Sequence, residues 1–260
     1  MTRIGLTLVV LGITLMTGVE SSELTPQLAE HMQRIASETS LLTPDHQAAS
    51  KKLGDWIARN SSADKPLHVT IICTGNSRRS MLGSVMGNAS AAYLGMPLVR
   101  FHSGGTTPSA FNKRTIASLR RVGVVIEPTG ENAPKGPAGG DNPKYTVRWG
   151  ATNPTSQLQV VEFSKHYRDP TNPQSGFAAV LVCTEADGAC PTVMGALTRI
   201  PAPFEDPKRF DDTPEEASRY DERRDDIARF MMLALQHAKA ILESSEKSVD
   251  TDHLKTGDQR

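Results

Sequence analysis

The chain has 260 residues, and its 29 basic and 29 acidic side chains give a formal net charge of zero. This balance gives no reason to expect a nucleic acid or an acidic membrane surface as a partner. Hydrophobic residues make up 38% of the chain and aromatic residues 5%. The composition is therefore that of a globular protein with one core, and aromatics are too scarce for a base-stacking surface.

The N-terminus has the pattern of a targeting segment. Residues 1–3 carry one positive charge, residues 4–18 are mostly apolar, and small residues follow at Ser21 and Ser22. This order is typical of a secretory signal peptide over 1–21, and the apolar part is short for a membrane span. A buried N-terminal strand or an uncleaved anchor is the alternative. We therefore expect an exported, periplasmic protein without stable membrane insertion, with the cytoplasm as the alternative location.

Two amphipathic helices are expected in an N-terminal extension over 22–66. Each begins with a Thr-Pro pair, Thr25-Pro26 and Thr43-Pro44, which suits an N-cap followed by the first helical position. Apolar residues then recur at helical spacing. Nothing in this extension indicates chemistry.

Alternating strands and helices follow from residue 67. Strand-like runs lie at 67–73, 98–103, 177–183 and about 198–204, and helix-like runs follow the first two strands. This alternation predicts an α/β domain over 67–245, with a four-stranded parallel sheet. Residues 128–143 are rich in Pro and Gly and read as a surface loop, and 145–150 and 158–164 as extra strands or a hairpin, so an insertion is expected over about 128–176. A long terminal helix precedes a polar tail over 246–260.

Three cysteines, Cys73, Cys183 and Cys190, are too few for a disulfide scaffold in a chain of this length. Cys73 and Cys183 each end a predicted strand, and open α/β sheets bind ligands at the carboxyl ends of their strands. The histidines show no metal-binding spacing, and no Gly-rich dinucleotide fingerprint is present. We therefore expect no metal and no cofactor.

The residues after Cys73 have the character of an oxyanion trap, with the pattern Cys-x5-Arg-Ser. A loop between a strand and a helix N-terminus can direct backbone N–H groups at an anion, and Gly75 permits an unusual turn. Arg79 adds a planar fork of donors, and Ser80 can donate a hydrogen bond to a thiolate, so Cys73 is expected to be a nucleophile. The alternative is a structural cysteine beside surface arginines. The predicted oxyanion-binding residues are Thr74, Gly75, Asn76, Ser77, Arg78, Arg79 and Ser80.

The run "VTIICTGNSRRS" resembles the phosphate loop of the low-molecular-weight protein tyrosine phosphatase superfamily. The resemblance covers about 67–126 and 177–242, and it implies a flavodoxin-like three-layer sandwich. It also implies an acid in Asp206-Pro207, where a carboxyl group protonates the leaving oxygen. "FHSGGT" resembles the second strand of that superfamily, which implies that Ser103 braces Asn76. Taken alone, Asp206-Pro207 reads as a turn.

The segment "VCTEADGACP" resembles thioredoxin-coupled arsenate reductases, one branch of that superfamily. By this resemblance Cys73 attacks arsenate, Cys183 is the second thiol and Cys190 the last. The implied partner is thioredoxin or a thioredoxin-like reductant. A static Cys183–Cys190 disulfide is the rival interpretation, since an oxidising compartment would close such a bond.

The sequence departs from the patterns of its relatives in this superfamily at three places. Arg78 replaces a cysteine found in many relatives, and Gly83-Ser84 replaces Ala-Glu, which removes a ligand of an alkali-cation site described for the reductases. The tyrosines that eukaryotic phosphatases carry after Asp-Pro are absent, and residues 208–210 read Lys-Arg-Phe.

The leading hypothesis is therefore an arsenate reductase with a three-cysteine relay. The second is a phosphatase acting on phosphotyrosine or a small phosphate ester through a phosphocysteine. The third, of another class, is a non-catalytic oxyanion-binding protein.

Overall fold

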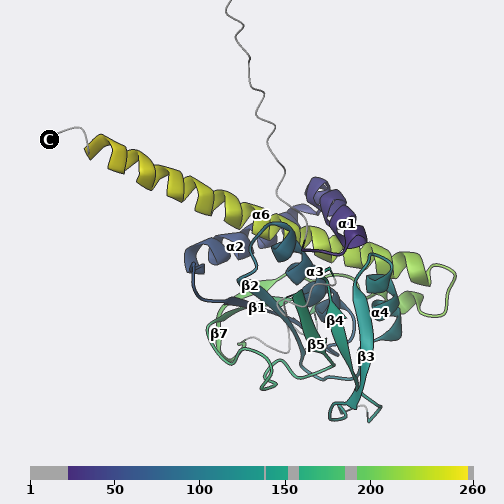
Figure 1. The fold of residues 1–260 in the computed structure, drawn as a ribbon. Coiled ribbons are helices and arrows are strands. Elements are labelled where there is room, and N and C mark those ends of the chain that lie inside the picture. The colour runs from purple at the N-terminus through teal and green to yellow at the C-terminus, as the bar shows by residue number, and fades with distance from the viewer. Residues whose placement is uncertain (1–22, 138, 152–157, 185–191, 257–260) are drawn as a thin grey trace, which may run out of the picture.

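The computed structural model describes residues 23–137, 139–151, 158–184 and 192–256 (Figure 1). The predicted signal peptide over 1–21 lies outside these ranges. The helices are α1 (Pro26–Ser37), α2 (Pro44–Asn60), α3 (Arg79–Tyr93), α4 (Lys113–Arg120) and α6 (Glu216–Thr256). The strands are β1 (Leu67–Cys73), β2 (Val99–Gly105), β3 (Val125–Asn132), β4 (Pro143–Arg148), β5 (Gln159–Glu162), β6 (Phe177–Leu181) and β7 (Ala196–Pro201).

Four of these strands form the parallel sheet that the sequence predicts. Their order is β2-β1-β6-β7, so the chain begins in the middle of the sheet and moves first to one side and then to the other. The register pairs Leu67 with Val99 and Val69 with Ala178. This is a flavodoxin-like order, and its reversal point lies between β1 and β6, at whose carboxyl ends Cys73 and Cys183 stand. The predicted α/β class is confirmed.

Small residues let α3 pack closely on the sheet. A Cβ atom at Gly83 would lie 2.8 Å from Ile71, and one at Gly87 would lie 2.5 Å from Phe101. Side chains larger than hydrogen would therefore push the helix away from β1 and β2. On the same side of the sheet α1, α2 and α6 lie together, and α6 contacts both α2 and α3 (Figure 1). This packing holds the N-terminal turn of α3 close to the end of β1.

A second sheet has the antiparallel order β3-β4-β5. The predicted strands over 145–150 and 158–164 correspond to β4 and β5. The predicted surface loop over 128–143 is partly wrong, because β3 continues to Asn132 and pairs there with Pro143. Pairing with β4 satisfies the backbone of a segment whose Pro and Gly content suggested a loop. Val147 and Trp149 are buried in this part of the core.

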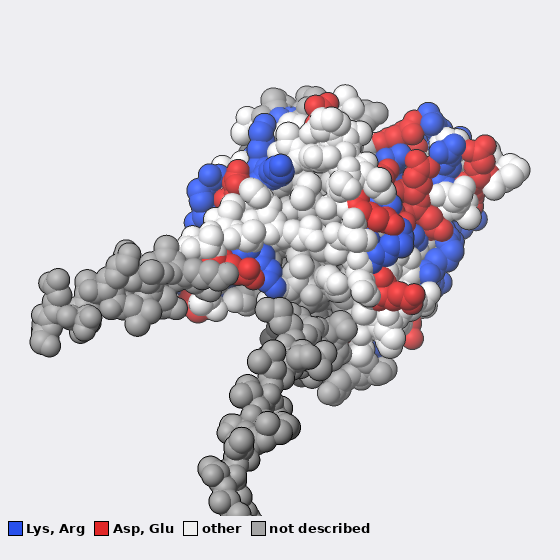
Figure 2. All heavy atoms as spheres, turned by 90° about the horizontal axis from the view of Figure 1, so that it is seen from above, with Lys and Arg blue, Asp and Glu red and all other residues white. Residues whose placement is uncertain are grey.

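Charges of both signs are mixed where α6 begins. Figure 2 shows acidic and basic side chains interspersed at this end of the molecule, and Arg219 pairs there with Glu215 and Glu222. Arg224, in contrast, is buried and donates to the carbonyl of Ser118. In the described ranges, no helix has the length and apolar character that crossing a membrane requires.

Candidate active site

The loop after Cys73 turns its carbonyl groups toward the segment 106–112. Cys73 itself is 4% exposed at the end of β1. Its carbonyl accepts from Thr106 N, that of Thr74 from Thr107 N, that of Gly75 from Ser109 N, and that of Ser77 from Asn112 N, at 2.8–3.2 Å. In the described part of the chain, no backbone N–H of residues 74–80 donates to an acceptor on the protein. The loop thus keeps its carbonyls occupied and its N–H groups available beside the N-terminus of α3, which is an arrangement that suits an anion.

Asn76, and not Gly75, adopts the left-handed backbone conformation in this loop. Its φ is 41°, whereas Gly75 is not among the residues with positive φ. Asn enters this region more readily than other non-glycine residues. Gly75 was expected to permit an unusual turn, and this role is corrected. It lets the loop approach Ser109 closely, since a Cβ there would lie 3.3 Å from the hydroxyl of Ser109.

A hydrogen-bond chain leads from Asn76 to the thiol. Asn76 Nδ2 donates to Ser80 Oγ at 2.9 Å, and Ser80 Oγ lies 3.1 Å from Cys73 Sγ. Because the Ser80 oxygen already accepts the amide N–H, its own proton is available to the sulfur. Asn76 and Ser80 are fully buried, so this arrangement is shielded from water.

Ser103 does not brace Asn76, which corrects the role implied by the resemblance. The Ser103 hydroxyl donates to Glu162 Oε2 at 3.0 Å. A buried carboxylate is a stronger acceptor than an amide oxygen, which accounts for this choice. Asn76 Oδ1 accepts instead from the backbone N–H of Lys165 at 2.8 Å. The loop is therefore held by a residue of the segment that the sequence predicts to be an insertion.

Arg79 reaches across the site from the first turn of α3. Its Nη1 donates to the carbonyl of Phe204 at 2.9 Å, and its Nη2 donates to Asp206 Oδ2 at 2.8 Å. The residue is 8% exposed, and its buried Nε has no hydrogen-bond partner among the described residues. A buried guanidinium N–H without an acceptor is costly. A ligand that accepts from this N–H would therefore stabilise the site.

Asp206 is partly exposed and is the N-cap residue of a short 3-10 helix over Pro207–Phe210. One carboxylate oxygen accepts from the backbone N–H of Lys208 at 3.0 Å, and the other faces Arg79. Its side chain is 34% exposed, so it can exchange protons with water. The structure thus places Asp206 beside Arg79, near the loop to which the resemblance assigned it.

Cys183 lies beside the same loop, two positions after the end of β6. It is fully buried, and its sulfur is 3.5 Å from Thr74 Oγ1. The structure therefore places Cys183 next to the residue that follows Cys73. Cys190, the other cysteine of the predicted relay, lies outside the described residues.

The side chain of Arg78 contacts α6. Its Nε donates to the hydroxyl of Tyr220 at 2.9 Å, and that hydroxyl donates to Asp211 at 2.7 Å. Burial, together with the hydrogen bond to Asp211, raises the pKa of Tyr220 well above its usual range, so Tyr220 remains a donor. Arg78 thus ties the start of α3 to α6, and its Nε also lies 4.0 Å from Asp206 Oδ1.

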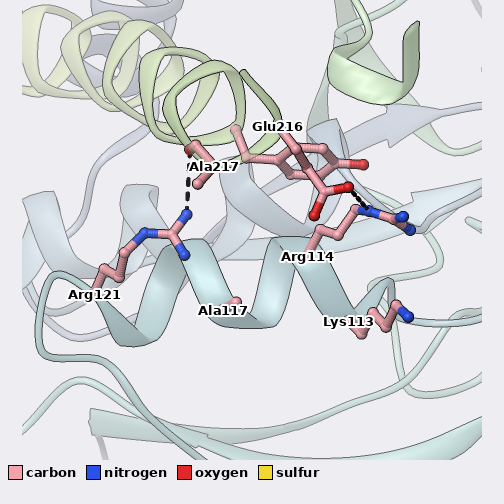
Figure 3. A pocket seen from close by; sticks show the side chains of 7 residues that line it. Lys113, Arg114, Ala117, Arg121, Glu216 and Ala217 are labelled. Carbon is pink, nitrogen blue, oxygen red and sulfur yellow. Dashed lines mark hydrogen bonds and ion pairs between the residues drawn. The ribbon is translucent and has the colours of Figure 1, made fainter. Parts of the chain in front are cut away.

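A hollow of about 240 Å³ lies between α4 and α6, beside Tyr220 (Figure 3). Figure 3 shows Arg114 pointing to Glu216 and Arg121 pointing to the carbonyl of Ala217. Both guanidinium groups are thus already engaged, and none of the predicted site residues lines this hollow. In the described ranges, no three His, Cys, Asp or Glu side chains gather closely enough to hold a metal ion.

Three further residues of the site were not predicted from the sequence. Ser164 Oγ donates to the carbonyl of Gly75 at 2.9 Å, and Glu162 and Lys165 form a buried ion pair at 3.2 Å. Glu162 and Ser164 lie on alternate positions of the predicted strand 158–164, and Lys165 directly follows it. That pattern does not reveal which loop they contact.

No family model and no curated protein matches the chain. Among solved structures, it is similar to low molecular weight protein tyrosine phosphatases. That from T. tengcongensis is 12% identical with a TM-score of 0.44, covering 65% of this chain and 98% of the other. That from Bacillus subtilis is 11% identical with a TM-score of 0.42, covering 67% and 98%. That from Vibrio cholerae O395 is 11% identical with a TM-score of 0.38, covering 70% and 98%.

Proposed function

We propose that this chain is an enzyme that binds a phosphate-type oxyanion and attacks it with Cys73, and that it hydrolyses phosphate monoesters through a phosphocysteine. The proposal is carried by donors for which the described residues supply no acceptor: the buried Nε of Arg79 and the backbone N–H groups of residues 74–80. Donors arranged in this way need a multiply charged oxyanion, and the nearest nucleophile is the thiol of Cys73.

The proposed reaction has two steps. The Cys73 thiolate attacks phosphorus while the bond from phosphorus to the leaving oxygen breaks, and the carboxyl group of Asp206 gives its proton to that oxygen. Water then attacks the phosphocysteine, gives a proton to Asp206, and displaces the Cys73 thiolate with release of phosphate. Arg79 and the loop N–H groups stabilise the charge on the transferred group, and Ser80 stabilises the thiolate that leaves.

Arsenate reduction is a second candidate, favoured by the 3.5 Å contact between Cys183 Sγ and Thr74. Arsenate has the shape and charge of phosphate, so the same loop would accept it. Cys73 would displace hydroxide from arsenic, and Cys183 would then attack the Cys73 sulfur. The electron pair of the sulfur–arsenic bond would pass to arsenic, which leaves as arsenite, and a Cys73–Cys183 disulfide would form. Cys190 would attack Cys183 and release Cys73, and a thioredoxin-like dithiol would reduce the remaining disulfide.

Two assays on the same variants distinguish these functions. Cys73→Ser should abolish both aryl-phosphate hydrolysis and arsenate reduction. The Cys183→Ser/Cys190→Ser double variant should keep hydrolysis if the protein is a phosphatase. If the double variant loses an arsenate reduction that the unaltered protein sustains with a thioredoxin-type reductant, the reductase function is established. Tight binding of vanadate without turnover of either substrate would contradict both and favour a non-catalytic oxyanion-binding protein.

A further inference from the structure

A buried cluster of polar side chains lies next to the loop 74–80. Glu162, 2% exposed, accepts hydrogen bonds from Ser84 of α3 at 3.1 Å, from Ser103 of β2 at 3.0 Å and from Lys165 Nζ at 3.2 Å. Lys165 is 6% exposed, and its ammonium group also lies 4.8 Å from the ring centre of Phe163. Three donors compensate the carboxylate for its removal from water, so the cluster holds the end of β5 against both α3 and β2.

The same lysine contacts the loop through its backbone. Lys165 N–H donates to Asn76 Oδ1 at 2.8 Å, and the Lys165 carbonyl accepts from Gly105 N at 2.9 Å. A side-chain amide has one accepting and one donating end, so a donor at Oδ1 directs the NH2 group to the opposite side. There it meets Ser80 Oγ at 2.9 Å. The Ser80 proton must then find another acceptor, and the sulfur of Cys73 is 3.1 Å away.

We infer that the buried Glu162–Lys165 ion pair is a positioning device for the nucleophile. By fixing the backbone of Lys165, the pair sets the orientation of the Asn76 amide, and that orientation commits the Ser80 hydroxyl to donate to the Cys73 thiolate. The inference rests on the proposed role of Cys73 as the attacking group. Neither Glu162 nor Lys165 touches the oxyanion; both act through Asn76 and Ser80.

The test measures Cys73 directly. Replacing only one member of the pair would leave a buried charge without its partner. The informative variant is therefore Glu162→Gln/Lys165→Met, which removes both charges and keeps similar side-chain volumes. The rate of Cys73 alkylation by iodoacetamide is followed against pH by mass spectrometry of the Cys73 peptide, with thermal melting as the check of folding. We expect roughly tenfold slower alkylation at pH 7 and a profile displaced to higher pH, with kcat for an aryl phosphate reduced more than KM is changed.

Two single variants complete the design. Lys144→Met removes an exposed ion pair with Glu131 in the same antiparallel sheet, and it should keep the unaltered alkylation profile. Asn76→Ala should displace the profile as the double variant does, and combining the two should add nothing further. A folded double variant with an unaltered profile overturns the inference. If the double variant does not fold, an unaltered profile in Asn76→Ala overturns it instead.

Failure of the proposed function gives a different result. If the unaltered protein turns over no oxyanion while the alkylation profile still moves as expected, the positioning role stands and the enzymatic proposal is wrong. A purely structural role of the pair would lower the melting temperature without moving the alkylation profile, and that result also overturns the inference.

Discussion

Ser80 Oγ lies 3.1 Å from Cys73 Sγ. The same oxygen accepts a hydrogen bond from the amide of Asn76, which leaves the serine proton free to be donated to the sulfur. A hydroxyl donor at this distance stabilises a thiolate more than a thiol, and it does so both before attack and when the sulfur leaves the phosphorylated intermediate.

Replacement of this serine tests that role. Ser80→Ala should lower the kcat for an aryl phosphate by about 10–100-fold, since a hydrogen bond to a charged group contributes about 1.5–3 kcal/mol. Stopped-flow kinetics would also show slower breakdown of the phosphocysteine. Ser90→Ala is the matched control, because Ser90 is a buried serine of the same helix that contacts Met32. Equal losses in the two variants would rule out a specific role for Ser80.

Arg79 should not be replaceable by lysine. Its fork spans Phe204 and Asp206 and still leaves Nε for a ligand, whereas an ammonium group is a single point of charge. We expect Arg79→Lys to lower kcat/KM by at least about 100-fold, which corresponds to about 2.7 kcal/mol. Vanadate binding, measured by calorimetry, should weaken in parallel. Arg219→Lys, on the exposed face of α6, should retain both kcat/KM and vanadate affinity. If Arg79→Lys also retained them, Arg79 would not be the residue that binds the oxyanion.

The acid role of Asp206 depends on the leaving group. Asp206→Asn cannot give up a proton, so esters with poor leaving groups should lose about 10²–10⁴-fold in rate. Esters with acidic phenols, which leave without a proton, should lose much less. Rates across a series of substituted phenyl phosphates would show a steeper dependence on leaving-group acidity than in the unaltered enzyme. Asp212→Asn, at a site 89% exposed, serves as control. An unchanged slope in Asp206→Asn would exclude Asp206 as the acid.

The folded state should lose stability at acidic pH because of a histidine pair on β1 and β2. His68 Nδ1 and His102 Nε2 are 3.0 Å apart. Burial, reinforced by the positive charges of His68, Lys165 and Arg100, lowers the pKa of His102 to about 3. An unfolded histidine binds its proton near pH 6.5, so between pH 6.5 and about 3 the unfolded state holds a proton that the native state lacks. The contribution of His102 to the free energy of unfolding should therefore be fully present above pH 6.5. It should fall on acidification, by about 2 kcal/mol between pH 6.5 and 5.

Urea unfolding at these two pH values checks this expectation. The loss should shrink in His102→Gln, which removes the titrating group. Parallel losses in the variant and the unaltered protein would show that another group is responsible.

The sequence predicts the parts of the site that are local in the chain. Cys73, Arg79 and Ser80 come together because a strand, a tight loop and a helix start follow one another. Asp206 is distant in the chain, and only the family resemblance pointed to it, since Asp206-Pro207 alone reads as a turn. Lys165 and Glu162 could not be predicted, because their role depends on how a distant segment packs against the loop. Ser103 shows the limit of a role implied by resemblance: the residue is where expected, but the carboxylate of Glu162, from that same segment, takes its hydrogen bond.

The contact of Lys165 with Asn76 also bears on how this protein can be shortened. The residues over about 128–176 read as an addition to a smaller domain, and a truncated chain without them would retain all four strands of the parallel sheet. It would lose the backbone donor that orients the loop amide, and with it the hydroxyl of Ser164 on the Gly75 carbonyl. The segment and the loop are therefore not separable modules, and exchanging it between related proteins would require the loop to be redesigned with it.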